Sequence, residues 1–341
     1  MTPPNQPAAA PRSLIVHQAH RPPAPVLRYI DQVVGTSTPG IEFRFSQGVL
    51  TEFDVDAVHV VDRNLDRLLG TRRASSTQRL IATAAFVRNL RRHRIALVRT
   101  LHGLHRHRSS RVDRLAIRLI DSATTTFVVF DDATRTPDSS RTVVIPHAEF
   151  SDRFLGYPRG EQVAGRVLCI TAGALPVAAE DLLGIPRAVS TDGVSLRLVG
   201  VPPEQLAASA RSALARHGAV FSMRPELVSD GAQVQEIDSA ELVVLPQTSA
   251  LEDLQTALLA LSRHRPVLTT HSEPFFELAR AVGPGWVHLS AGPITAEDVD
   301  AALASLRSTR TQYPNLEGRD LPTIRAAYAE VFRSAIADVR G

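Results

Sequence analysis

The chain has 341 residues, of which 44% are hydrophobic and 21% charged, and this composition is typical of a folded globular protein. This length fits two domains of about 150 to 180 residues and is too long for one ordinary core. The single cysteine, Cys169, excludes a disulfide within the chain, and no apolar run reaches the roughly 18 residues that a membrane span needs.

The net charge of +3 conceals an uneven distribution of charge along the chain. Residues 1–158 carry 22 arginines and 14 acidic residues, whereas residues 159–341 carry 16 arginines and 21 acidic residues. A basic half suggests an anionic partner. Aromatic residues make up only 5% of the chain and no nucleic-acid motif is present, so a membrane surface or lipid phosphate fits better than nucleic acid.

The first twelve residues are rich in proline and alanine and lack the basic start and apolar centre of a signal peptide. They predict a disordered lead-in. Together with the lone cysteine, they favour a cytoplasmic location in a reducing compartment, with the basic half able to reach the inner face of the membrane.

Strand and helix patterns alternate through the first half, residues 13–158, and predict a parallel sheet. The strands are expected at residues 13–17, 41–46, 57–61, 96–101, 126–130 and 142–145, and the helices at 25–34, 75–94 and 111–121. The helix at 75–94 is either an ordinary amphipathic helix packed on the sheet or a basic patch that meets a membrane.

A polar, turn-rich linker at residues 157–165 separates this half from a second alternating unit at residues 166–310. A long helix at residues 320–341 follows. The second set of strands is expected at residues 166–171, 195–199, 220–223, 241–245, 266–270 and 286–289, and helices at 178–183, 203–217, 251–263, 275–282 and 296–306. The chain therefore predicts an α/β protein with two doubly wound, Rossmann-like domains.

Five segments carry a resemblance to a known family. They read DVDAVHVVDRN, LVRTLHGLHRHRS, VVIPHAEFSDRF, ELVVLPQ and ALLALSRHRPVLTT. In this order they resemble GT-B bacterial polysaccharide glycosyltransferases of the GDP-mannose:glycolipid 4-β-mannosyltransferase type. The resemblance implies two Rossmann-like domains facing a central cleft, with the acceptor on the first domain, the nucleotide-sugar donor on the second, and a final helix that crosses back to the first.

Two departures from the family pattern keep other functions open. The loop 174–177 has no basic residue where the family reaches the donor phosphates, and no E-x7-E pair is present. One alternative is therefore a catalytically degenerate GT-B partner subunit. Another is a nucleotide-sugar epimerase on the same fold.

Candidate catalytic residues follow the predicted strands of the first half, where open α/β sheets bind ligands. Asp62 is the natural base for the acceptor hydroxyl, although it could instead cap a helix at 63–69. His102 and His107 are expected to act or to position substrate. His59 matches a histidine of the family pattern. Together with His147 and Glu149, it is assigned to the acceptor side of the cleft.

Donor-binding candidates lie in the second half. Gly173 would let the backbone approach the diphosphate. Arg224 would pair with a phosphate, and Thr248 and Ser249 precede a helix whose free N–H groups suit an anion. The pattern contains no complete set of metal ligands. The resemblance implies an inverting glycosyltransferase that uses GDP-mannose as donor and a glycolipid or polysaccharide as acceptor. The residues predict that it is metal-independent and needs no cofactor beyond its donor.

Overall fold

A computed structural model describes residues 13–18, 32–34, 39–45, 50, 53–61, 65–101, 110–170, 192–200, 221–224, 229–246, 250–308 and 312–341. The chain divides into two units. Unit 1 comprises Met1–Pro146 and Pro322–Gly341, and unit 2 comprises His147–Leu321. Unit 2 is thus inserted into unit 1, and each is described by itself.

Unit 1 contains a six-stranded parallel sheet with the strand order β2-β1-β3-β4-β5-β6. Short apolar runs form these strands because both faces of a parallel sheet are covered. The strands are β1 (Leu14–Gln18), β2 (Ile41–Phe45), β3 (Ala57–Val61), β4 (Ala96–Thr100), β5 (Thr126–Val129) and β6 (Thr142–Val144).

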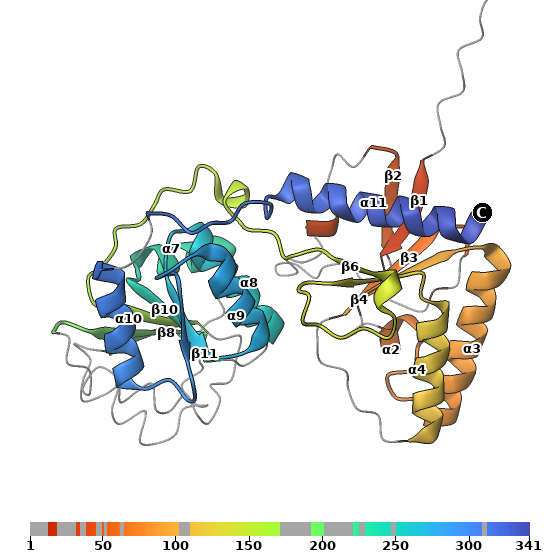
Figure 1. The fold of residues 1–341 in the computed structure, drawn as a ribbon, viewed down its shortest axis with the longest axis horizontal. Coiled ribbons are helices and arrows are strands. Elements are labelled where there is room, and N and C mark those ends of the chain that lie inside the picture. Colours follow the sequence, from red (N-terminus) through yellow and green to blue (C-terminus); the bar gives the residue numbers. More distant parts are fainter. Residues whose placement is uncertain are drawn as a thin grey trace, which may run out of the picture. The chain divides into compact units, whose positions relative to one another are not determined.

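Four helices of unit 1 are α2 (Leu65–Leu68), α3 (Ser76–His93), α4 (Arg111–Ala123) and α11 (Leu321–Arg340). Ser75 and Gln78 form a capping box that starts α3, as the serine at this position predicts. Phe86, Val87 and Leu90 of α3 pack in the core with β3 and β4. The opposite face of α3 is solvent-exposed, so α3 is an amphipathic helix packed on the sheet (Figure 1).

The last helix, α11, packs on strands that lie near the start of the chain (Figure 1). Phe332 is fully buried and meets Phe43 of β2 and the ring of His59 of β3. Arg340 forms an ion pair with the buried Asp56, which also accepts a hydrogen bond from the backbone of Ile15. The final helix therefore completes the core of the unit that begins the chain.

Unit 2 contains a second six-stranded parallel sheet, with the order β12-β11-β10-β7-β8-β9. Its strands are β7 (Arg166–Ile170), β8 (Ser195–Val199), β9 (Phe221–Arg224), β10 (Leu242–Leu245), β11 (Val267–Thr270) and β12 (Val287–Ser290). Its helices are α7 (Asp230–Ser239), α8 (Ala250–Ser262), α9 (Glu273–Val282) and α10 (Ala296–Ser308). One apolar cluster packs α7, α8 and α9 on one face, and another packs α10 on the other face.

The boundary between the units lies before the expected linker at 157–165. Segment 147–165 is bound to unit 2, because the backbone of Phe150 donates to Ser262 and that of Val163 donates to Ser239. Gly165, just before β7, has φ +73°, and a Cβ atom there would lie 2.4 Å from the carbonyl oxygen of Gly193. The linker therefore ends in a position that only glycine fits.

The predicted parallel α/β architecture is confirmed, including all twelve strands within a few residues. The sequence analysis missed α7, which links β9 to β10, whereas the short α2 lies within the helix considered at 63–69. The helices expected at 178–183 and 203–217 lie outside the described residues, as does most of the one expected at 25–34.

Candidate functional site

Each sheet has a point at which the strand order reverses, and open α/β sheets bind ligands beyond the carboxyl ends of the strands at such points. In unit 1 this point lies between β1 and β3, and in unit 2 between β7 and β10. Asp62 directly follows β3. Gly173 follows β7, and Thr248 and Ser249 follow β10. These four residues themselves lie outside the described residues, but the strands that precede them lie at the two switch points.

His59 lies on β3 beside the switch point of unit 1, and its side chain is only 1% exposed. Its Nδ1 is 2.7 Å from Oε1 of Gln18, the last residue of β1, and its Nε2 is 2.9 Å from the hydroxyl of Thr100, the last residue of β4. Since an amide oxygen can only accept, Nδ1 donates to Gln18. The predicted acceptor residue His59 is thus a buried group that joins the ends of the two neighbouring strands β1 and β4.

The amide Nε2 of Gln18 is also buried, and it has no hydrogen-bond partner among the described residues. Tyr328 and Phe332 of α11 cover the same imidazole. His59 therefore stabilises the strands at the switch point from a buried position. A ligand bound there would contact the residues that follow the strands.

His147 and Glu149 were expected on the acceptor side of the cleft, but the structure groups both with unit 2. Their backbones exchange hydrogen bonds with Arg319: the Glu149 N–H donates to its carbonyl, and its guanidinium donates to the carbonyl of His147. The carboxylate of Glu149 accepts from the backbone of Ser151 at 2.5 Å. Both residues are buried, so in this structure they hold the segment that enters unit 2.

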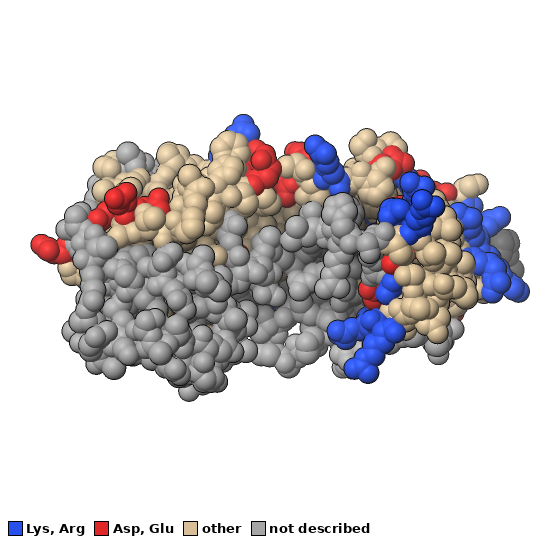
Figure 2. Space-filling model, turned by 90° about the horizontal axis from the view of Figure 1, so that it is seen from below, with Lys and Arg blue, Asp and Glu red and all other residues tan. Residues whose placement is uncertain are grey.

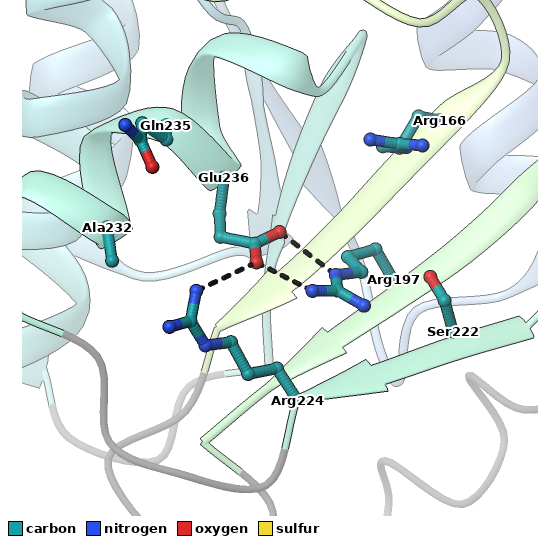
Figure 3. Close-up of a pocket in the computed structure, with 7 residues that line it drawn as sticks. All are labelled: Arg166, Arg197, Ser222, Arg224, Ala232, Gln235 and Glu236. Carbon is teal, nitrogen blue, oxygen red and sulfur yellow. Dashed lines mark hydrogen bonds and ion pairs between the residues drawn. The ribbon is translucent and has the colours of Figure 1, made fainter.

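Arg224, the predicted phosphate ligand, ends β9 at the edge of the unit 2 sheet, with β8 between it and β7. It does not lie at the switch point. Instead it lines a pocket of 430 Å³ beside α7 (Figure 3), whose lining residues are Arg166, Arg197, Ser222, Arg224, Ala232, Gln235 and Glu236.

The carboxylate of Glu236 organises this pocket. Arg197 donates to both of its oxygens, at 2.9 and 2.7 Å, and Arg224 approaches one of them at 3.6 Å (Figure 3). Burial alone would raise the pKa of Glu236, but the hydrogen bonds and charge of Arg197, helped by Arg224, hold it below its ordinary value. The same hydrogen bonds raise the pKa of Arg197, so Glu236 and Arg197 are both charged at neutral pH.

The candidate catalytic residues His102 and His107 lie outside the described residues. Both lie in the sequence between β4 and α4. At the start of α4, Ser110 caps the helix and bonds to Asp113, which also pairs with Arg79 of α3. Hydrogen bonds from Ser110, Arg79 and Ser76 outweigh burial and lower the pKa of Asp113.

Sequence reasoning missed the residues that hold the predicted ones. Gln18 and Thr100 bind His59. Glu236 pairs with Arg224 and also accepts hydrogen bonds from Arg197. A polar residue at the end of an apolar strand was a usable signal for Gln18 and Thr100. No signal in the sequence pairs Glu236 with two arginines on different strands.

No three histidine, cysteine, aspartate or glutamate residues among the described residues gather as metal ligands. None of the described helices is both long and apolar enough to cross a membrane.

Comparison with known proteins places this architecture. No protein family model matches the chain. Among solved structures, the Anabaena protein HepE in complex with UDP and glucose is similar with a TM-score of 0.56 and 12% identity, over 95% of this chain and 100% of that one. The lipopolysaccharide outer core galactosyltransferase WaaB is similar with a TM-score of 0.56 and 12% identity, over 96% of this chain and 99% of that one. The chain has the GT-B fold.

The sequence is also similar over nearly its whole length to curated proteins. A GDP-mannose:glycolipid 4-β-D-mannosyltransferase of Xanthomonas campestris pv. campestris is 29% identical over 336 residues, which are 96% of this chain and 94% of that protein. A second protein of that name from the same organism is 28% identical over 335 residues. This GT-B protein therefore resembles the bacterial polysaccharide glycosyltransferases, as the five sequence segments predict.

Proposed function

We propose that this protein is a glycosyltransferase that transfers mannose from GDP-mannose to a glycolipid or polysaccharide acceptor. The observation that carries the proposal is the similarity, across 96% of the chain, to two mannosyltransferases with that donor in their name. The two parallel sheets with GT-B topology support it, since each unit has a switch point at which one of the two substrates could bind.

The donor is proposed to bind unit 2 at the β7–β10 switch point. Gly173 follows β7 in the sequence, and a residue without a side chain would let a diphosphate approach the backbone. Thr248 and Ser249 lead into α8, whose first N–H groups would donate to the phosphates. The chain has no lysine, so arginine side chains, serine hydroxyls and backbone N–H groups are the donors available to the phosphates.

The acceptor is proposed to bind unit 1 at the β1–β3 switch point. Asp62 takes the proton of the acceptor hydroxyl. The hydroxyl oxygen attacks the anomeric carbon of the donor as the bond between that carbon and the GDP oxygen breaks. One such displacement inverts the anomeric centre and gives a β-linkage. His102 and His107 orient the reacting groups, and no metal ion is required, so EDTA should leave turnover unchanged.

We propose that the protein binds its acceptor at a membrane surface. Helix α3 contains no acidic residue, and its exposed face carries Arg88, Arg91 and Arg92. Ile81 of α3 and Leu115 of the neighbouring α4 are 64% and 53% exposed. Figure 2 shows arginines grouped on the surface of unit 1. Exposed aliphatic side chains among arginines suit peripheral binding to anionic lipid.

The first test is calorimetric titration with GDP-mannose, GDP, UDP-glucose and UDP. Binding of the guanine ligands alone is expected. Asp62→Asn should then keep this binding and lose transfer to a lipid-linked acceptor by about a hundredfold or more, as expected for removal of a general base. Asp338→Asn, an exposed change on α11, is the matched control and should leave transfer unchanged.

Two other outcomes would overturn the proposal. A UDP-GlcNAc 2-epimerase from Methanocaldococcus jannaschii has a similar fold, with a TM-score of 0.51 and 10% identity. Deuterium exchange from solvent into the donor sugar without transfer would indicate that chemistry. No binding of any nucleotide would instead favour a partner subunit without catalysis, which the loop 174–177 without a basic residue also suggests.

A further inference from the structure

The pocket beside α7 lies apart from the proposed donor site. Its residues come from the three strands β7, β8 and β9, on the face that α7 partly covers (Figure 3). Arg166 is the first residue of β7, at the opposite end of that strand from the switch point. Arg197 lies directly beside Ser222 in the register of β8 and β9. The pocket therefore runs along the sheet face rather than over the carboxyl ends.

The pocket carries an excess of positive charge. Three guanidinium groups face one carboxylate, so its lining residues have a net charge of +2. Arg197 already uses two donors on Glu236. The side chain of Arg166 has no hydrogen bond or ion pair with any described residue, and Figure 3 shows it apart from the Glu236 cluster.

The side chain of Arg224 is 41% exposed, so water solvates part of its charge, and three guanidinium groups around one carboxylate create a positive potential that attracts an anion. Each guanidinium presents a planar fork of N–H donors that matches two oxygens of a phosphate. The hydroxyl of Ser222 and the side-chain amide of Gln235 add neutral donors at the same pocket. A tetrahedral dianion would satisfy this set better than a single carboxylate, which Glu236 already supplies.

We propose that this pocket binds a phosphate group, with Arg166, Arg224 and Ser222 as its ligands and the Arg197–Glu236 pair as the fixed support of Arg224. The site is inferred independently of the proposed sugar transfer. The phosphate belongs either to a nucleotide bound at this pocket or to another phosphorylated ligand. The chemistry of recognition is the same for both sources.

The test is calorimetric titration of the full chain with inorganic phosphate and pyrophosphate at low ionic strength, where exposed charges are least screened. The wild-type protein should bind at least one of them. Arg166→Gln and Arg224→Gln should each weaken binding by about tenfold, the effect of losing one charge-assisted hydrogen bond. Arg280→Gln is the matched control, because Arg280 is an exposed arginine of unit 2 that pairs only with its helix neighbour Glu277 among the described residues.

A second arm separates the two sources. If GDP competes with phosphate and loses affinity in Arg166→Gln, the pocket takes the diphosphate of a nucleotide. If phosphate binds equally well in the presence of saturating GDP, the pocket is a separate phosphate site. The proposal is overturned if wild type binds neither anion, or if both pocket variants bind phosphate, pyrophosphate and GDP as the Arg280→Gln control does. Phosphate binding without GDP-mannose binding would refute the proposed donor and leave the pocket standing.

Discussion

Single residues at strand ends show how far the residue type alone reveals a role. His59 was identified from its place on an apolar strand, and the structure puts it there. Its buried bonds to Gln18 and Thr100, however, give it a supporting position rather than an open one. Arg224 was identified as an anion ligand. The carboxylate that it shares with Arg197 belongs to Glu236, which lies on a helix that the sequence did not predict. In both cases the partner comes from a different element.

Cys169 gives a prediction at this scale. It is fully buried on β7, and burial, reinforced by the charge of Asp253, raises its pKa to about 12. A thiol reagent acts on the thiolate, so the native protein should not react with Ellman's reagent at pH 8. One thiol per chain should appear in denaturant, since this is the single cysteine. Rapid labelling of the native protein would contradict the buried position.

Elements were predicted well where their own pattern is strong. Helix α11 has twenty residues and a continuous apolar stripe, and its predicted range agrees with Leu321–Arg340 within one residue. Helix α7 was missed because its sequence, DGAQVQEIDS, is short and polar and has glycine in its first turn. Tertiary contacts stabilise it: Val234 and Ile237 pack in the core, and Asp238 pairs with the buried Arg263.

The packing of α11 leads to a prediction at the element scale. Phe332→Ala should lower the free energy of unfolding by about 3–5 kcal/mol, because a fully buried ring leaves a cavity against β2 and β3. Urea denaturation followed by circular dichroism measures the change. Phe276→Ala is the control, since that ring is 40% exposed, and should cost less than about 1 kcal/mol. Equal losses in the two variants would show that α11 does not complete the core.

At the scale of the whole molecule, the chain leaves unit 1, builds unit 2 and returns to finish unit 1. The basic first half seen in the sequence corresponds to the exposed arginines of unit 1, among them those of α3. The return is structural, because the terminal helix covers His59 and pairs with Asp56. Unit 1 is therefore discontinuous, whereas unit 2 is one continuous segment.

This arrangement predicts how fragments behave. Residues 147–321 should fold alone, with cooperative thermal unfolding. Residues 1–146 should not, because the buried His59 and Asp56 lose their cover. Joining residues 322–341 to residue 146 through a short Gly-Ser linker should restore cooperative unfolding, monitored by near-ultraviolet circular dichroism. Cooperative unfolding of residues 1–146 by themselves would show that α11 is dispensable.

The sequence by itself determined the two parallel sheets, the strand positions and the GT-B resemblance, because alternating apolar runs and helical periodicity are local signals. It also placed Asp62, Gly173, Thr248 and Ser249 after strands that the structure brings to the two switch points. Only the tertiary structure decided which residues share a site. The bonds of His59 and the pairing of Glu236 with Arg197 and Arg224 join strands and helices far apart in the chain, and no local pattern encodes a contact between side chains that folding alone brings together.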